Sequence, residues 1–451
     1  MIPWITRNLI YIPIYLMRGE HTLKYMEEIQ KYHKKPAYVM RQIQWQKLID
    51  ILNYANDHNH YYKKLFAENS IDVKRIKDAS DFMKIPILTK EAINLKANEM
   101  ISTDSRRISK RKTSGSTGIP LVFVKDRDAT AYMDAMMHEV YSWYGIELGD
   151  RQGRIWGMPL GFKARTFTQI KDLLLNRKRM VSFEINRSNS IDFYNILKKF
   201  KARFLYGLVN TTVEFTKELI DAGLDPATLR FNAVITTGEI LFPFQRDFLK
   251  QAYQCPIVNE YGTTENGIVA FECKKGKLHL LTHNVYIEFI NPETNQPAKP
   301  GELGEVIITE LHSYAMPFIR YKVGDLARPS NETCDCGLEL PVISEVVGRV
   351  SDLIITPDGR QVSSAILSYS MPKGVKRFRT FQKSPSGIEV LLQEKAPIGK
   401  DDLLSFEKKL RHYLGEEIKI DIKKVDTIPI DSSGKFRHFV TEIQHESSKV
   451  R

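Results

Sequence analysis

The stretch 112–120, KTSGSTGIP, places two glycines, two serines and two threonines between segments of apolar, strand-like sequence. Gly115 and Gly118 carry no Cβ, so backbone amides there can approach an anion, and the neighbouring hydroxyl groups add donors. No Lys-Ser or Lys-Thr pair ends a G-x-x-x-x-G unit, which excludes a Walker loop. Alone, the stretch fits either a phosphate-binding loop or a flexible turn, and other motifs are needed to distinguish the two.

Short apolar segments alternate with helical ones after Arg107, and this alternation predicts an α/β architecture. Strands are expected within PLVFVKD (120–126), GRIWGMP (153–159), RFLYGLV (203–209), FNAVITTGE (231–239) and CPIVNEYG (255–262). Helices are expected over Thr130–Tyr144 and Gln245–Gln254. Between 267 and 327 the strands become closely spaced and are separated by Pro, Gly and Asn turns, which predicts a mostly antiparallel region.

With 451 residues the chain exceeds what one hydrophobic core usually organises. We expect a large N-terminal domain over 1–347, with a mainly helical lead-in over 1–105 and a β-rich part over about 267–345. In the lead-in, Tyr38–Asn69 has helical spacing and Thr89 is placed to cap a helix that starts at Lys90. A small, mobile α+β C-terminal domain is expected over 348–451, with the hinge near 348–352.

The composition is that of an ordinary soluble globular protein, with 42% hydrophobic and 27% charged residues. The formal net charge is +12, but lysines and arginines are interspersed with acids. This favours anionic small molecules or an anionic membrane surface as partners and argues against nucleic acid, for which no binding motif is present. Four cysteines are too few for a disulfide framework, so we expect a reducing, cytoplasmic location.

The apolar N-terminal segment 1–20, MIPWITRNLIYIPIYLMRGE, is interrupted by Arg7. Its longest uncharged run is too short to span a bilayer, and the segment lacks the features of a signal peptide. Two interpretations stay open. The segment either packs as a helix on the protein's own core, or makes peripheral contact with the inner membrane face, for which Trp4, Tyr11 and Tyr15 are suited.

Three further motifs follow TSGSTGIP in order: NEYGTTE (259–265), YKVGDLA (321–327) and SSGKFR (432–437). Together with GRVSD (348–352), they make the chain resemble the acyl-adenylate-forming, or AMP-binding, superfamily of carboxylate-CoA ligases and their relatives. The resemblance spans about 113–437. Within that superfamily the chain is similar to the phenylacetate-CoA ligase branch and especially to its CapK-like relatives of capsular polysaccharide synthesis. The supporting residues are IPILTKEAI (85–93), Leu121 after the loop proline, and GRVSDLIITPDGRQV (348–362).

The resemblance implies that ATP and a carboxylate react to acyl-AMP and pyrophosphate, with ATP and Mg²⁺ as cofactors. It implies that the nucleotide is bound by Thr113, Ser114, Gly115, Ser116, Thr117, Gly118, Gly238, Glu239, Asn259, Tyr261, Gly262, Thr263, Asp325 and Arg349. In this scheme the loop 114–118 holds the β and γ phosphates. Tyr261 stacks on adenine, and Asp325 accepts hydrogen bonds from the ribose hydroxyls.

Catalytic roles are implied by the resemblance for Lys435, Glu265 and Thr264. Lys435 would neutralise the acyl carboxylate and the α-phosphate in the transition state, and Glu265 would hold Mg²⁺. Asp352 would be the hinge about which the small domain rotates between two half-reactions. Without the resemblance, Lys435 would be interpreted as a solvated loop lysine and Glu265 as a helix-capping acid.

A zinc site is predicted from Cys273, His279, Cys334 and Cys336, because three sulfurs and one imidazole suit tetrahedral zinc. Their positions are also similar to a zinc-binding feature of some members of this branch. Four protein ligands leave no open position for water, so a structural role is expected. Reduced surface thiols are the alternative, and His283 could replace His279; Cys255 is expected in a buried strand.

The acceptor of the acyl group is left open by the sequence. LIITPDGRQVSS (353–364) lacks the lysine that many acyl-CoA ligases carry after the hinge, which argues against coenzyme A. We expect the acyl pocket around MPLGFKAR (158–165), LYGLVNTT (205–212) and Gly262, with Trp156, Phe162 and Tyr206 as lining residues.

Three functions are therefore compared. The favoured one is a ligase of cell-surface polysaccharide synthesis that transfers the acyl group to a thiol or an amine, for example an amino sugar. The second is an aryl- or acyl-CoA ligase of catabolism, and the third is a non-catalytic nucleotide-binding protein. Formation of a CoA thioester would distinguish the first two.

Overall fold

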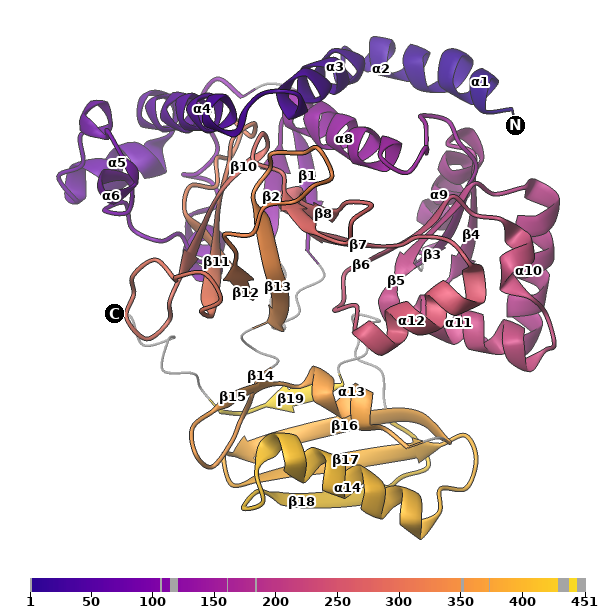
Figure 1. Cartoon of the computed structure of the whole chain (residues 1–451). Coiled ribbons are helices and arrows are strands. Elements are labelled where there is room, and N and C mark those ends of the chain that lie inside the picture. Colours follow the sequence, from indigo (N-terminus) through magenta and orange to yellow (C-terminus); the bar gives the residue numbers. More distant parts are fainter. Residues whose placement is uncertain are drawn as a thin grey trace.

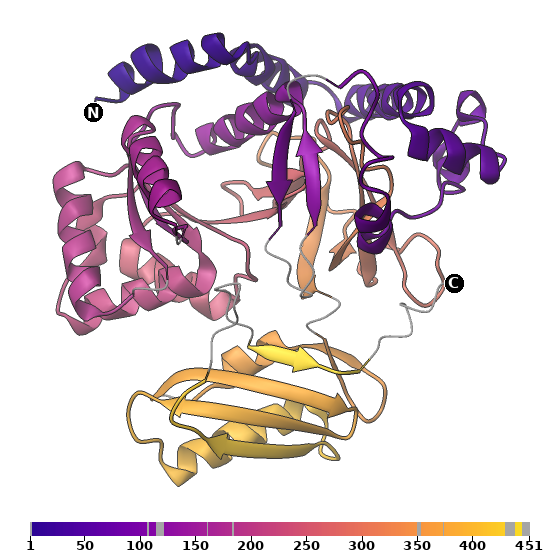
Figure 2. The same cartoon turned by 180° about the vertical axis from the view of Figure 1, so that it is seen from behind.

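The computed structural model describes residues 2–105, 108–113, 121–159, 161–182, 185–349, 353–372, 374–428 and 438–443. A large body holds an 11-stranded sheet, and a smaller C-terminal unit with a 4-stranded sheet lies below it (Figure 1; seen from behind in Figure 2). The predicted fold class, α/β with a small α+β C-terminal part, is confirmed.

The chain begins with a series of helices that cross the top and one side of the large body (Figure 1). Their bounds are α1 Pro3–Ile5, η1 Thr6–Tyr11, α2 Ile12–Arg18, α3 Thr22–His33, α4 Ala37–His58, α5 His60–Glu68, η2 Val73–Arg75, α6 Ala79–Phe82 and α7 Lys90–Lys96. Thr89 caps α7 as predicted, since its Oγ1 accepts a hydrogen bond from the N–H of Ala92 at 3.2 Å.

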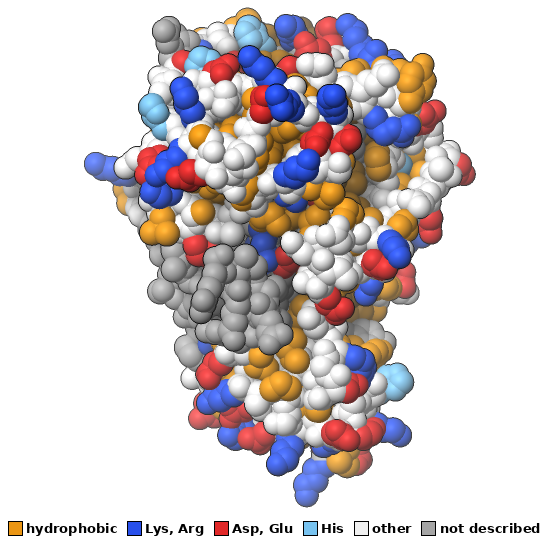
Figure 3. All heavy atoms as spheres, turned by 90° about the vertical axis from the view of Figure 1, so that its left-hand side faces the viewer, with side chains coloured by type: hydrophobic (Ala, Val, Ile, Leu, Met, Phe, Trp, Pro, Cys, Tyr) orange, Lys and Arg blue, Asp and Glu red, His pale blue; other side chains and the backbone are white. Residues whose placement is uncertain are grey.

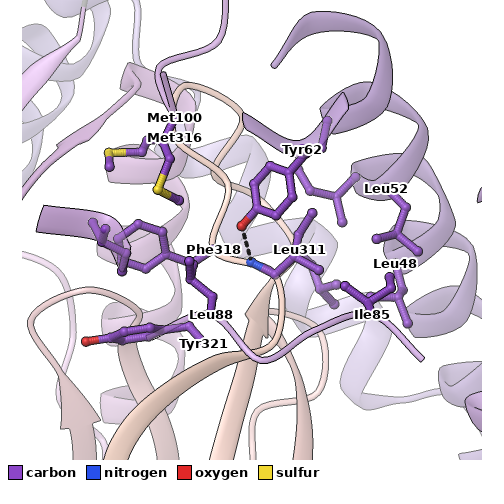
Figure 4. Packing of buried hydrophobic residues seen from close by; sticks show 14 of the residues in the cluster. Leu48, Leu52, Tyr62, Ile85, Leu88, Met100, Leu311, Met316, Phe318 and Tyr321 are labelled. Carbon is purple, nitrogen blue, oxygen red and sulfur yellow. Dashed lines mark hydrogen bonds between the residues drawn. The ribbon is translucent and has the colours of Figure 1, made fainter. Parts of the chain in front are cut away.

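One hydrophobic core joins these helices to the antiparallel part of the sheet (Figure 4). Leu48 and Leu52 of α4 and Tyr62 of α5 pack against the segment that leads to Tyr321. The Tyr62 hydroxyl donates to the carbonyl of Pro317 at 2.9 Å and accepts from the N–H of Ile319 at 3.0 Å. The helical lead-in is thereby fixed to the strand that carries YKVGDLA.

The large sheet changes from parallel to antiparallel between β7 and β8, in the order β10-β11-β12-β13-β9-β8-β7-β6-β5-β3-β4. The parallel strands are β3 Gln152–Trp156, β4 Arg177–Val181, β5 Phe204–Leu208, β6 Ala233–Thr237 and β7 Ile257–Thr263. The antiparallel strands are β8 Gly267–Glu272, β9 Leu278–Leu280, β10 Val285–Ile290, β11 Gly304–Glu310, β12 Tyr321–Pro329 and β13 Val342–Arg349. A separate hairpin pairs β1 Ser109–Lys112 with β2 Val122–Lys125.

Helices cover both faces of the parallel half. One face contacts α8 Arg127–Ser142 and α3, whereas the other contacts α10 Arg187–Phe200, α11 Val209–Asp221 and α12 Pro243–Tyr253. Strand alternation explains this division, because Ala233 and Ile235 pack toward α8 while Val234 packs toward the other core. The remaining helices of this half are α9 Phe162–Leu174 and η3 Pro226–Leu229.

The C-terminal unit begins with a hairpin of β14 Leu353–Ile355 and β15 Gln361–Ser363. It continues with α13 Ala365–Ser370, β16 Val375–Ser384, β17 Gly387–Glu394, α14 Lys400–Leu414, β18 Lys419–Lys424 and β19 Phe439–Thr441. The strand order is β18-β17-β16-β19, and α14 buries Phe406 and Leu410 in a core of this unit. Lys395 forms an ion pair with Glu218 of α11 at 3.0 Å, which links the unit to the large body.

The N-terminal helices have one buried and one exposed side. Tyr11 and Tyr15 pack with Leu148, whereas Trp4 and Leu16 on the other side are 65% and 73% exposed. Among the described residues, no helix has both the length and the apolar character needed to cross a bilayer. Elsewhere, on the face shown in Figure 3, basic and acidic side chains are intermingled.

Candidate active site

A wide cleft lies at the carboxyl ends of the parallel strands, between the large body and the C-terminal unit. It is lined by the ends of β3, β5, β6 and β7, by β12 and β13 of the antiparallel half, and by residues of β19. Ligands of open α/β sheets bind at this end of the strands, where the direction of the connections changes. The fold therefore brings three of the four sequence motifs to one cleft.

The expected phosphate loop begins at this cleft, at Thr113. The N–H of Thr113 donates to the carbonyl of Leu121 at 2.9 Å, and the N–H of Leu121 donates to Oγ1 of Thr113 at 2.9 Å. These two bonds extend the β1–β2 hairpin, and Thr113 lines the cleft. The loop residues Ser114, Gly115, Ser116, Thr117 and Gly118 lie outside the described residues, as do Asp352 and Lys435.

Tyr261 of β7 meets Asp325 and Arg349, which lie on the neighbouring strands β12 and β13. The Tyr261 hydroxyl donates to Oδ2 of Asp325 at 2.9 Å, while Nε of Arg349 lies 3.5 Å from Oδ1. Asp325 and Arg349 face each other in the β12–β13 register. Burial, and then the Asp325 charge, raises the pKa of Tyr261, so this phenol stays protonated and remains a donor. The carboxylate is thus fixed at the edge of the cleft where a ribose could reach it.

The turn from β7 to β8 carries the other motif residues. A Cβ at Gly262 would lie 2.6 Å from the carbonyl oxygen of Gly267, so the turn requires glycine there. Thr263 Oγ1 accepts from the N–H of Asn266 at 3.0 Å. Thr264 is exposed, and Oε1 of Glu265 accepts from the hydroxyl of Tyr321 at 3.2 Å.

The Glu265 carboxylate is suited to a metal ion. Within the described part of the chain, Tyr321 is its only hydrogen-bond partner, which leaves the second oxygen for a cation. Burial and the charge of Glu265 raise the pKa of Tyr321, so this partner also stays a donor. Carboxylate oxygen is the ligand type that Mg²⁺ prefers.

The loop that follows β6 and contains Gly238 and Glu239 is held in place by local contacts. Gly238 has φ +75°, a conformation that favours glycine, and Glu239 accepts a hydrogen bond from the N–H of Asn210 at 2.7 Å, at the start of α11. The N–H of Asn259 donates to Glu272 at 2.8 Å, and Glu272 also pairs with Arg246 at 2.8 Å. Gly238, Glu239 and Asn259, which were predicted to bind the nucleotide, therefore lie on a fixed rim of the cleft.

A second group of side chains lies on the α8 face of the sheet, and of these the sequence analysis assigned a role only to Tyr206. Glu260 is buried and accepts hydrogen bonds from the hydroxyls of Tyr141 at 3.0 Å and Tyr206 at 2.9 Å. Burial raises the pKa of Glu260. Its signal in the sequence is a charged residue within an apolar strand, a pattern that Arg154 in β3 shares.

Of the three aromatic residues predicted to line the acyl pocket, two lie at the cleft and one does not. Trp156 and Tyr206 line the cleft, and their ring centroids are 5.5 Å apart. Phe162 is 84% exposed on α9 and does not line it, because the helix turns this side chain toward solvent. The expected contribution of Phe162 is therefore wrong.

The four predicted zinc ligands are brought together next to β8 and β9. The ligand atoms of Cys273, His279, Cys334 and Cys336 all lie within 4.8 Å of one another. Nδ1 of His279 is bonded to the carbonyl of Leu340 at 2.9 Å, which leaves Nε2 directed at Sγ of Cys336, 3.3 Å away. Three sulfurs and one imidazole, with the other imidazole nitrogen hydrogen-bonded to a carbonyl, form a donor set that could hold a tetrahedral metal ion such as zinc.

His283 and Cys255, which the sequence analysis discussed beside the four predicted ligands, lie outside the cluster. His283 is fully buried outside the cluster, its ring 4.9 Å from that of His33, so His279 is the histidine of this site. Cys255 is only partly buried, in the turn before β7, and not in a strand as expected, because β7 begins at Ile257.

Comparisons with known proteins show which families and proteins the chain is similar to. Residues 113–313 match the family described as AMP-binding enzyme, and residues 354–442 match the CapK C-terminal domain. Protein CapK of Staphylococcus aureus is 23% identical over 448 residues, covering 95% of this chain and 94% of that protein. A phenylacetate-coenzyme A ligase of Thermus thermophilus is 21% identical over 341 residues, covering 71% and 72%.

Solved structures show the same architecture. The structure of 2-hydroxyisobutyryl-CoA ligase in the postadenylation state, in complex with 2-HIB-AMP, has a TM-score of 0.75 at 16% identity and covers 92% of both chains. Because the coverage includes the C-terminal unit, the two proteins share the fold over nearly their whole length.

Proposed function

The chain belongs to the adenylate-forming, or AMP-binding, superfamily of ligases, in its phenylacetate-CoA ligase-like branch, and from this we propose how it uses its cleft. It activates a carboxylate with ATP and transfers the acyl group to an acceptor in cell-surface polysaccharide synthesis. The observation that carries the proposal is the joint position of Tyr261, Asp325 and Glu265 at the carboxyl end of β7. Membership of an enzyme family favours catalysis over a non-catalytic nucleotide-binding role.

The first half-reaction joins the acid to AMP. A carboxylate oxygen attacks the α-phosphorus, the bond to the leaving pyrophosphate breaks, and pyrophosphate departs with the electron pair. Asp325, held by Tyr261 and Arg349, accepts the ribose hydroxyls, and the loop 114–118 binds the departing phosphates. Glu265 holds Mg²⁺, which offsets phosphate charge when bound.

Lys435 supplies the positive charge for the transition state. The segment that contains it ends at His438, and His438 and Phe439 line the cleft. The connection 350–352, which contains Asp352, joins β13 of the large sheet to β14 of the C-terminal unit. We infer that residues 1–347 and 348–451 are two domains and that rotation about Asp352 exchanges the faces presented to the cleft.

The proposed acceptor is an amine, for example on an amino sugar. Support comes from the match to Protein CapK over 95% of this chain, and from the missing lysine after Asp352. A thiol acceptor, coenzyme A, is the second candidate, favoured by the match to phenylacetate-coenzyme A ligases. Assay of both acceptors with preformed acyl-AMP distinguishes the two.

The adenylation step is tested by carboxylate-dependent exchange of labelled pyrophosphate into ATP. Aromatic, fatty, amino and sugar acids form the panel. Lys435→Ala is expected to lower exchange by about 1,000-fold while ATP binding stays intact, since one positioned charge is removed. Lys423→Ala, in a partly exposed pair with Glu389, is the matched control in the same unit. Full exchange in Lys435→Ala would reject the mechanism.

We also propose that Cys273, His279, Cys334 and Cys336 bind one structural Zn²⁺. Metal analysis of the purified protein is expected to give about one equivalent, and Cys336→Ser is expected to lower both metal content and thermal stability. Less than about a tenth of an equivalent would contradict the proposal.

We also propose that the protein is cytoplasmic and that residues 1–20 make peripheral contact with the inner membrane face. Its support is the exposed apolar side of α1 to α2, where Arg7 and Arg18 are basic and no acid precedes Glu20. Vesicles with anionic lipid are expected to sediment the protein more than neutral ones, and Leu16→Asp to abolish this. Equal sedimentation of that variant would reject the contact.

A further inference from the structure

Arg154 lies on the face of the sheet that carries Glu260. In β3, Gly153 and Ile155 face the opposite core, where a Cβ at Gly153 would meet Leu197 at 2.8 Å. Alternation then directs Arg154 toward α8. Its guanidinium carbon lies 5.0 Å from the ring centroid of Trp156 and 4.7 Å from that of Tyr206, so two aromatic rings support the charge.

This guanidinium has no acidic partner within the described part of the chain. Its Nε is buried without a hydrogen bond. The neighbouring Arg179, in contrast, binds Asp172 through two bonds of 2.6 and 2.9 Å. Burial and the charge of Arg177 lower the pKa of Arg154 to about 10, so it is still charged at neutral pH.

The nearest acid does not neutralise it by contact. Both oxygens of Glu260 are occupied by Tyr141 and Tyr206, and burial favours the neutral form of this carboxyl group. Arg154 is half-buried, and its Nε has lost contact with water without gaining an acceptor, a cost that a bound carboxylate would remove. The surroundings of Arg154 therefore favour the binding of an anion.

The anion would come from the cleft. Trp156 and Tyr206, whose rings flank the guanidinium, line the cleft together with Glu260 and with Gly262, around which the acyl pocket is expected. Glu260 and Tyr261 point to opposite faces of β7, so an acid on the α8 face is separated from the nucleotide side. Gly262 lies two residues beyond Glu260, about 7 Å along the strand.

We propose that Arg154 binds a second carboxylate of the acid substrate, so that the enzyme activates a dicarboxylic acid at its other end. This rests on the proposed function. A planar guanidinium held against two rings presents its N–H groups as a fork that matches a carboxylate. Only the proximal carboxylate attacks the α-phosphorus and expels pyrophosphate; the distal one is unchanged.

The test compares acids of equal length. Pyrophosphate exchange is measured with dicarboxylic acids of three to six carbons and with the corresponding monocarboxylic acids. The wild type is expected to favour the best dicarboxylic acid by at least about 100-fold, because a neutral chain end leaves the Arg154 guanidinium without an anionic partner. Arg154→Met should remove this preference and leave the monocarboxylic rate unchanged or raised.

Two further variants complete the design. Arg154→Lys keeps the charge without the fork and should retain part of the preference, which shows that loss in Arg154→Met is not a folding defect. Arg41→Met, on the exposed side of α4 and away from the cleft, should behave as wild type. A wild type that favours monocarboxylic acids, or equal losses for both classes in Arg154→Met, would overturn the inference while the adenylation proposal stands.

Absence of exchange with every acid would instead count against the proposed function. In that case, calorimetric titration of the same acids into wild type and Arg154→Met decides the inference independently of catalysis. Binding of dicarboxylic acids that is lost in Arg154→Met supports it. Equal binding to both proteins, or no binding to either, rejects it.

Discussion

The two faces of the sheet at the end of β7 are built in different ways. On one face, Tyr261 and Asp325 are hydrogen-bonded to each other, and Arg349 sits beside them on an adjacent strand. On the other face, Glu260 is buried and Arg154 is half-buried among aromatic rings, and no ion pair joins the two in the described part of the chain. On the first face the polar and charged side chains bond to one another. On the second, the charge of Arg154 has no acidic partner in the described part of the chain.

This difference has a functional consequence. The face whose polar groups bond to one another suits the nucleotide, a ligand shared by all members of a superfamily. The carboxylate of Asp325 is held in place there before ATP arrives. The face with an unpaired charge suits a ligand that differs between enzymes, the acid, because recognition then depends on what the ligand supplies. Gly262 connects the two faces, which makes it the position where both can be disturbed together.

Gly262→Ala is expected to have the largest effect. The new Cβ would lie 2.6 Å from the carbonyl oxygen of Gly267, so β7 and β8 must separate at the turn. A displacement of about 1 Å at a reacting centre can cost about 100-fold in rate. We expect exchange to fall by at least that factor, with the KM values for ATP and for the acid both raised in steady-state assays.

A matched control is available in the same chain. A Cβ at Gly161 has no atom within 4 Å, so Gly161→Ala should leave exchange unchanged. If Gly262→Ala raised only one of the two KM values, the connection between the faces would be refuted.

Asp325→Asn is expected to have an intermediate effect, confined to the nucleotide face. The substitution removes the charge that pairs with Arg349 and weakens the acceptor for ribose. Loss of a charged hydrogen bond of 1.5 to 3 kcal/mol corresponds to an increase of about 10- to 100-fold in the KM for ATP. The KM for the acid should change less than about twofold.

The exposed pair of Arg328 with Glu345, on the same two strands, provides the comparison. Glu345→Gln should change neither KM, because such surface pairs contribute little. A parallel rise of both KM values in Asp325→Asn would show that the faces do not act separately.

The residues proposed for the nucleotide were named through the resemblance of ordered motifs to the AMP-binding superfamily, and much of the fold was predicted from the alternation of strand-like and helical segments. Glycine, threonine and acidic residues at turns have narrow conformational roles, so motifs such as NEYGTTE and YKVGDLA mark turns and strand ends directly. The cysteine pattern likewise brought four ligands together, because sulfur and imidazole at these positions have one common chemistry.

The acid face was predicted only in part, since Trp156 and Tyr206 were expected to line the acyl pocket and do line the cleft, whereas Arg154 and Glu260 were given no role. Arg154, Tyr206 and Glu260 come from three strands separated in sequence, and their roles depend on the register that aligns β3 with β5 and on burial beneath α8. Phe162 shows the converse, since an aromatic residue next to the pocket in sequence is turned outward by its helix. Strand pairing and helix rotation are long-range outcomes that spacing alone does not reveal.

Glu260→Gln is expected to have the smallest effect, on the pH dependence of stability. Because burial raises the folded-state pKa of Glu260 above its ordinary value of 4.5, the favourable state is the protonated one. This contribution is fully present below pH 4.5 and is lost as pH rises toward the folded-state pKa; each unit of elevation corresponds to about 1.4 kcal/mol. The wild type should therefore lose stability relative to Glu260→Gln as pH rises.

Urea unfolding of both proteins between pH 4.5 and 8 measures this difference, starting at the ordinary pKa of 4.5. Both proteins share the Cys/His cluster, so any contribution of bound metal cancels. Glu345→Gln, which alters an exposed acid, should run parallel to wild type. Parallel curves for Glu260→Gln as well would mean that Glu260 is neutralised by a full charge, and then Arg154 would already have its partner within the protein.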